Sequence, residues 1–296
     1  MAASLWPFWD VRGQYREGER RLREVLGRAP QAPTIERGRA LDAQGWLVAL
    51  QGDFEAAWDL MRVGLPMVRA AGDEHWLAWS LAEQGNIAFS LGRTDETEQL
   101  FAESLELALR LDDTFLIGLG HFGLAYAAFL RGDLGEMSAR LARSLELTRL
   151  VIQPWGIAWA QFSVGIVSIM LGDTLDAVAP VTESLELRWS IRDARGLAES
   201  IQVLATLASA HGDADWSALL HGAAELQREA NGLTILPFLR PLHDDSVARL
   251  REQLDPAELS RRWNLGRTMP LEKLVAEAMA RADAVTPSPF AAPTDA

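Results

Sequence analysis

The residue types that carry most enzyme chemistry are scarce in this sequence. It has no cysteine, which excludes disulfides, thiol nucleophiles and Cys-ligated zinc or iron–sulfur sites. Its one lysine, Lys273, lies in Leu-Glu-Lys-Leu and so outside any G-x-x-x-x-G-K-[ST] phosphate loop. The histidines do not form H-x-x-x-H or H-E-x-x-H, and a structural role is favoured for all five: His75, His121, His211, His221 and His243. We therefore expect no metal, no cofactor and no enzyme activity, although a Ser-His-Asp triad is spatial and stays open.

One motif matches a nucleotide-binding pattern. Residues 118–123 read Gly-Leu-Gly-His-Phe-Gly, which fits G-x-G-x-x-G. That motif binds a dinucleotide only where it follows a strand and opens a helix in a βαβ unit. Here it lies inside a helical segment, so we do not interpret it as a nucleotide site.

Charge and hydropathy exclude other classes. The chain has 28 basic and 41 acidic residues, and a net charge of -13 argues against direct nucleic-acid binding. With 49% hydrophobic residues it can bury a large core. It shows neither a secretory leader nor an uninterrupted apolar run of about 18 residues, so we predict a cytoplasmic protein with no membrane partner.

A repeat of 40 residues runs through most of the chain. It is marked by turn glycines and, seven residues before each, by a small residue. The turn glycines are Gly52, Gly92, Gly132, Gly172 and Gly212, and the small residues are Gly45, Gly85, Ala125, Gly165 and Ala205. Five turns and five small residues in one register indicate five copies of one unit.

Each unit is typical of two helices, for example residues 76–91 and 94–111. A glycine just past a helix provides the left-handed end, and the Asp that often follows can cap the next helix. Glycine inside a helix costs about 1 kcal/mol, which close approach of the paired helices would offset. We expect the matching small residues on the second helices to be Gly64, Ser104, Ser144, Ser184 and Ala224. Pro66 and Pro180 fall inside predicted second helices, where we expect kinks.

These features predict an all-α chain, since no alternating strand pattern is present. A hairpin alone cannot bury its apolar face, so the copies must stack as a solenoid. The small residue at the eighth position of the first helix, the turn Gly and the small residue on the second helix resemble the tetratricopeptide (TPR) repeat. The 40-residue period resembles the MalT-like sensor region of LuxR-type transcription regulators with a signalling ATPase. The stretches 219–225, 247–252 and 263–272 are similar to the end of that region.

The resemblance implies a right-handed TPR-like superhelix whose first helices line a concave groove. Positions 2, 5, 9 and 12 of each first helix would then face the groove, and in this sequence many of them are aromatic. The contact residues expected for a ligand or peptide are Trp46, Trp79, Asn86, Phe122, Tyr126, Trp159, Phe162 and Gln202. The alternative is that these aromatic side chains pack between neighbouring helices.

The predicted domains are a solenoid over 1–231, a helical cap over 232–283 and a disordered tail over 284–296. The solenoid comprises a partial first repeat, 5–28, and five repeats from about residue 35. Leu233–Pro241 is expected to be an irregular connector with two prolines. Because the first repeat is short, we expect a longer chain originally preceded by more repeats.

The sequence thus predicts a non-enzymatic recognition solenoid, the sensor or interaction region of a bacterial signal-dependent transcription regulator. Its partner would be a protein, a peptide or a small-molecule effector in the groove. The alternative is a scaffold that self-associates through an apolar N-terminal end carrying Trp6, Phe8 and Trp9. An enzyme is the third and least supported interpretation.

Overall fold

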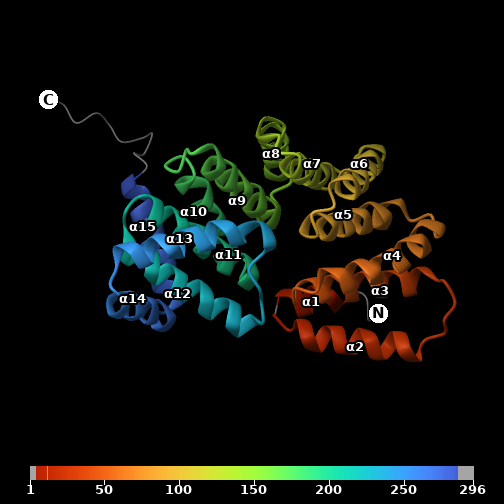
Figure 1. The fold of residues 1–296 in the computed structure, drawn as a ribbon. Helices are drawn as coiled ribbons and strands as arrows, with labels where there is room; N and C mark the ends of the chain where they lie inside the picture. Colours follow the sequence, from red (N-terminus) through yellow and green to blue (C-terminus); the bar gives the residue numbers. More distant parts are fainter. Residues whose placement is uncertain (1–4, 12, 286–296) are drawn as a thin grey trace. The chain divides into compact units, whose positions relative to one another are not determined.

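The computed structural model describes residues 5–11 and 13–285, in which all the regular secondary structure is helical. Consecutive helices pair as hairpins along the chain (Figure 1). The hairpins are α1 (Trp6–Val11) with α2 (Tyr15–Arg28), α3 (Ile35–Ala49) with α4 (Phe54–Ala70), α5 (Glu74–Ser90) with α6 (Thr94–Leu111), α7 (Thr114–Leu130) with α8 (Leu134–Leu150), α9 (Pro154–Leu171) with α10 (Val178–Ser190), and α11 (Ala194–Ala210) with α12 (Ala214–Asn231). A 3-10 turn, η2 (Pro237–Leu239), then leads to α13 (Arg240–Gln253), α14 (Pro256–Thr268) and α15 (Leu271–Val285). The all-α hairpin fold expected from the repeat is confirmed.

The chain forms two compact units, which divide within α9. Unit 1 comprises the residues up to 160 together with 228–240, and unit 2 comprises 161–227 together with the residues from 241 onward. The predicted boundary at residue 231 is therefore not where the compact units separate, and it stays a prediction. Ala284 and Val285 belong to α15, and the rest of the predicted disordered tail lies outside the described residues.

The repeated turns have the backbone that the glycines predict. The φ angles of Gly52, Gly92, Gly132, Gly172 and Gly212 are +92°, +70°, +76°, +88° and +80°. The Asp after the turn caps the next helix in three repeats: Asp53 accepts from the Ala56 N–H at 3.1 Å, Asp133 from Glu136 at 2.9 Å and Asp213 from Trp216 at 3.0 Å. In these three repeats the turn thus ends one helix and starts the next.

The glycines inside the first helices lie where the paired helices approach closely. A Cβ atom at Gly85 would be 2.7 Å from Cε2 of Phe101, and one at Gly165 would be 2.3 Å from Cγ2 of Val181. The close approach is confirmed, but the facing residues are large. Two of the small residues of the second helices contact the start of the paired first helix instead. A Cβ on Gly64 would be 3.0 Å from the Gly38 carbonyl oxygen, and Ser104 Oγ donates to the Ala78 carbonyl oxygen at 2.8 Å.

The two prolines behave differently. Pro66 lies inside α4, as expected. The prediction is wrong at Pro180, because α10 begins only at Val178. Pro180 is therefore in the first turn, where a backbone N–H has no partner within the helix and its loss costs little.

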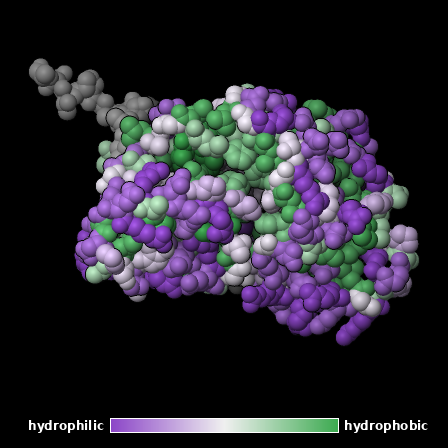
Figure 2. Space-filling model, viewed as in Figure 1, coloured by the Kyte–Doolittle hydropathy of each residue, from purple (hydrophilic) through white to green (hydrophobic). Residues whose placement is uncertain are grey.

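One helix among the described residues, α9, is long and apolar enough to cross a membrane. Its mean hydropathy is 1.4, and 56% of the residues in that stretch are buried in the structure. A buried apolar helix of this kind is typical of a protein core. Figure 2 shows hydrophobic residues gathered over α9 and α10 on the face drawn, and the exposed ones after α9 include Leu175.

Candidate functional site

Four aromatic side chains form a continuous row on the first helices of three consecutive hairpins in unit 1. Phe89 of α5 stacks on Tyr126 of α7, with ring centroids 4.2 Å apart and planes at 13°. Phe122 of α7 lies 4.5 Å from Tyr126 and meets Trp159 of α9 edge-on at 6.2 Å. We call Phe89, Phe122, Tyr126 and Trp159 the aromatic row. It brings together three of the predicted contact residues.

The aromatic row is largely covered. The exposed fractions are 6% for Phe89, 7% for Phe122, 5% for Tyr126 and 7% for Trp159. The rings pack between neighbouring first helices, which is the alternative interpretation of this pattern. Their use as ligand contacts stays a prediction.

Part of the cover comes from the segment that follows α12. The Phe238 ring lies 5.3 Å from Phe89, 6.1 Å from Tyr126 and 6.3 Å from Phe129. Leu233–Pro241 is thus more than the irregular connector expected from its prolines, because Phe238 packs on the row. A signal was present, because Leu-Thr-Ile-Leu-Pro-Phe-Leu over 233–239 is apolar where a surface loop is normally polar.

Trp79 and Asn86, which also lie on α5, are both half-buried. Trp79 stacks on Phe115 with centroids 6.0 Å apart, and its Nε1 donates to Oε1 of Glu83 at 2.8 Å. The predicted contact role of Trp79 and Asn86 stays a prediction.

Trp46 of α3 meets the N-terminal helix. Its ring contacts Trp6 edge-on at 6.3 Å, and its Nε1 donates to Asp10 at 3.3 Å. Trp9 is only 8% exposed and belongs to the core of the first two hairpins, against which Trp6 also packs. The expectation of an exposed apolar end is therefore wrong for Trp9, is met only in part by Trp6, which is partly buried, and holds for Phe8, which is 52% exposed.

Two buried carboxyl groups lie near each other in unit 1. Asp42 of α3 accepts a hydrogen bond from Ser80 Oγ at 2.6 Å. Burial raises the pKa of Asp42 to about 6. Burial, and then the charge of Asp42, raise the pKa of Glu83 to about 8. Each acid thus holds a proton at a higher pH than an exposed carboxyl group does.

The two remaining predicted contacts lie inside unit 2. Phe162 is fully buried, with the Arg188 guanidinium carbon 4.6 Å from its ring centroid, and Gln202 is 3% exposed. Arg188 is fully buried too, donates to the Gly196 carbonyl oxygen at 2.6 Å and pairs with Glu199 at 3.3 Å. Burial raises the pKa of Glu199 above its usual range. In this structure Phe162 and Gln202 are core residues, and their ligand role stays a prediction.

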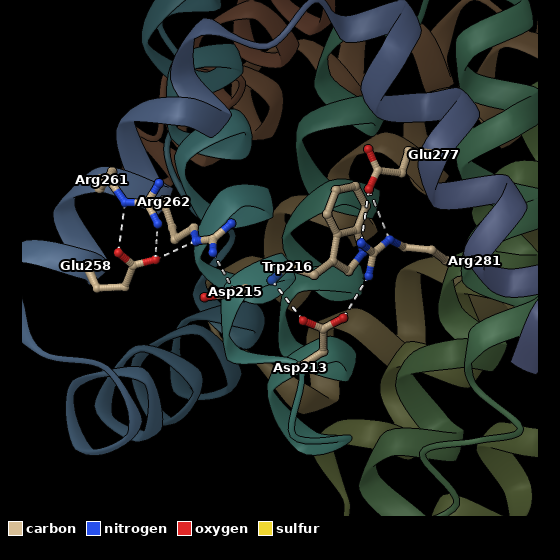
Figure 3. Close-up of polar contacts among 8 residues, drawn as sticks. All are labelled: Asp213, Asp215, Trp216, Glu258, Arg261, Arg262, Glu277 and Arg281. Atoms are coloured by element: carbon tan, nitrogen blue, oxygen red, sulfur yellow. Dashed lines mark hydrogen bonds and ion pairs between the residues drawn. The ribbon is translucent and has the colours of Figure 1, made fainter.

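A second polar network in unit 2 joins α12 to the last two helices (Figure 3). Arg281 of α15 pairs with Asp213 at 2.7 Å and with Glu277 at 3.0 Å, and its guanidinium lies 4.4 Å from the Trp216 ring centroid. Arg262 of α14 links Asp215 to Glu258 at 2.7 Å each. Hydrogen bonds from Arg261 and Arg262 lower the pKa of Glu258 to about 2. Each of these charges faces an opposite one, so the network links the N-terminal end of α12 to α14 and α15.

Metal chemistry finds no support in the part of the chain that the structure describes. No group of three or more His, Asp or Glu side chains there is placed to hold an ion. The G-x-G-x-x-G stretch lies within α7, where a Cβ at Gly123 would be 1.9 Å from the Phe101 ring. Gly123 thus allows α7 to pack closely against Phe101 of α6.

The fold is similar to that of solved TPR-like proteins. A Rap protein crystallised in complex with competence and sporulation factor matches with a TM-score of 0.64 and 14% identity, over 90% of this chain and 82% of that one. Aspartyl phosphate phosphatase F from Bacillus subtilis matches with a TM-score of 0.52 and 8% identity, over 96% of this chain and 92% of that one. No protein-family model matches the sequence, and no curated protein does. The resemblance is therefore shown as a TPR-like helical-repeat fold, and neither structure is a MalT-like sensor region.

Proposed function

We propose that this chain is a non-enzymatic recognition module that binds a peptide segment of a partner through the aromatic row of unit 1. The observation that carries the proposal is the placement of Phe89, Phe122, Tyr126 and Trp159 on the first helices of consecutive hairpins. Aromatic side chains give large contact area at a small entropic cost, which suits them to bind apolar peptide residues.

The similar fold of a Rap protein that was crystallised with a factor supports a partner of this kind. The likeness of residues 219–225 and 263–272 to MalT-like sensor regions supports a role in a cytoplasmic transcription regulator. In that role, peptide binding would favour one of two states of the solenoid through its differential affinity for them.

The test is a selection of peptides on the immobilised wild-type chain, followed by affinity measurements on Tyr126→Ala and Trp159→Ala. Loss of either ring should weaken binding at least about tenfold, as for central aromatic contacts of an interface. The matched control is Trp189→Ala in unit 2, where the side chain is already 38% exposed. Unchanged affinity in both row variants, with folding intact by circular dichroism, would disprove the proposal.

A second candidate function is self-association, and exposed apolar side chains at the end of α8 favour it. Leu150 is 69% exposed and Ile152 is 80% exposed. Molar mass by light scattering over a wide concentration range separates the two functions, because a scaffold would grow in mass and a peptide receptor would stay monomeric.

A further inference from the structure

Residues 233–239, here called the strap, lie along unit 1 as a bound peptide would. Residues 233–236 belong to neither a helix nor a strand, and η2 follows. Leu233 packs against the core of the first two hairpins. At the turn of the second hairpin, a Cβ on Gly52 would be 2.9 Å from Thr234 Oγ1. Phe238 reaches the third and fourth hairpins through Phe89 and Tyr126. The strap therefore crosses successive hairpins in chain order.

Among the described residues no backbone hydrogen bond joins the strap to the hairpins beneath it, so side-chain contacts hold it there. The Leu233 N–H donates to the Arg228 carbonyl oxygen at 2.9 Å, and the Leu239 N–H to that of Leu236 at 3.0 Å. Both of these bonds close locally, in the strap and the end of α12. Phe238 is its aromatic anchor, and it remains partly exposed while the rings beneath it are nearly covered. Phe238 lies in the short 3-10 turn η2, so its ring can leave the row without breaking a sheet or an α-helix.

We propose that the strap is a removable occupant of the aromatic row, and that the external partner is an extended peptide that puts an aromatic side chain in the place of Phe238. This inference rests on the proposed function. The strap shows what chemistry the row accepts, which is an apolar stretch, Ile-Leu-Pro, ahead of one aromatic ring. Because the strap is tethered, it competes at an effective concentration that can reach the millimolar range.

The experiment measures binding of a fluorescein-labelled peptide with the sequence of residues 231–240, NGLTILPFLR, by fluorescence anisotropy. The proteins are the wild-type chain and Phe238→Ala. We expect the variant to bind at least about tenfold more tightly, since its own strap no longer fills the row. A peptide carrying the same Phe238→Ala change should lose that binding.

Phe8→Ala is the matched control, because it also removes an exposed phenylalanine, 52% exposed, but one outside the row. It should bind the peptide as weakly as the wild-type chain does. Phe238→Leu keeps an apolar anchor and should give an intermediate affinity, and circular dichroism checks that each variant is folded.

Equal affinity of the wild-type chain and Phe238→Ala for the peptide would overturn the inference, and so would no binding to any folded variant. A different result distinguishes failure of this inference from failure of the proposed function. A peptide selected on the wild-type chain whose affinity depends on Tyr126, but not on Phe238, would leave the proposed function standing and refute the strap as its competitor.

Discussion

The carboxyl group of Glu83 is buried among apolar helices, and its pKa is raised to about 8 by burial and by the charge of Asp42. The usual pKa of a Glu side chain, near 4.5, applies to the unfolded chain. Between these two values the folded state keeps a proton that the unfolded state releases. The free energy of unfolding must therefore fall as pH rises from about 4.5 to about 8.

Glu83→Gln should remove much of this pH dependence, because an amide cannot ionise and can still accept the hydrogen bond from Trp79. We expect the variant to be more stable than the wild-type chain at pH above 8 by at least about 1.4 kcal/mol, the equivalent of one pKa unit. Urea unfolding at acidic and alkaline pH measures it. Glu55→Gln, at a carboxylate whose side chain is 68% exposed, is the control, and parallel pH profiles for all three proteins would contradict the account.

Ile152 has a backbone that its side chain disfavours. Its φ is +49°. In the turns that follow α4 and α12, the equivalent positions are held by Gly72 and Gly232, with φ of +72° and +64°. A left-handed conformation costs about 1–2 kcal/mol for a residue with a Cβ. Ile152→Gly should therefore stabilise the chain by about 0.5–1 kcal/mol, after the extra freedom of glycine in the unfolded chain is subtracted.

The thermal midpoint of unfolding measures this gain. Ile152→Ala is the comparison, because it keeps the Cβ and so most of the strain. If Ile152→Ala stabilises the chain as much as Ile152→Gly does, the gain comes from removing the exposed isoleucine side chain and not from relieving backbone strain.

At the scale of elements, the helix pairs depend on glycines that have no space for a methyl group. Gly85→Ala would gain about 1 kcal/mol of helix propensity. It would also put a Cβ 2.7 Å from the fully buried Phe101 ring, and overpacking of this kind costs about 1–3 kcal/mol. We expect net destabilisation in urea unfolding. Gly27→Ala, in α2 with no atom within 4 Å of the new Cβ, should be neutral or stabilising, and the same result at both sites would contradict this packing argument.

The elements themselves were predictable because the repeat is local. A turn glycine, an Asp cap and a small residue at fixed spacing determine where each helix ends, and the helix predicted over 94–111 coincides with α6. Pro180 differs from expectation because the turn after Gly172 extends to Ala177, so that α10 begins only two residues before the proline. The site was harder to predict, since periodicity places Tyr126 on a face but does not show that Phe238 covers that face.

At the scale of the whole molecule, the net charge of -13 should affect which peptides arrive rather than how they are held. The aromatic row is apolar, so contacts within it set the dissociation rate. The field of the whole chain attracts cations from a distance, and salt shortens its range from about 14 Å near 0.05 M to about 4 Å near 0.5 M.

The association rate of the NGLTILPFLR peptide, which carries the Arg240 side chain, with Phe238→Ala should therefore fall several-fold between those salt concentrations, while its dissociation rate changes little. Stopped-flow fluorescence measures both rates. In a peptide with Arg240→Glu the sign of that charge is reversed. Its association rate should be lower than that of the original peptide at low salt and similar to it at high salt. If salt instead changes mainly the dissociation rate, the peptide is held by ion pairs, and the aromatic row is not its principal contact.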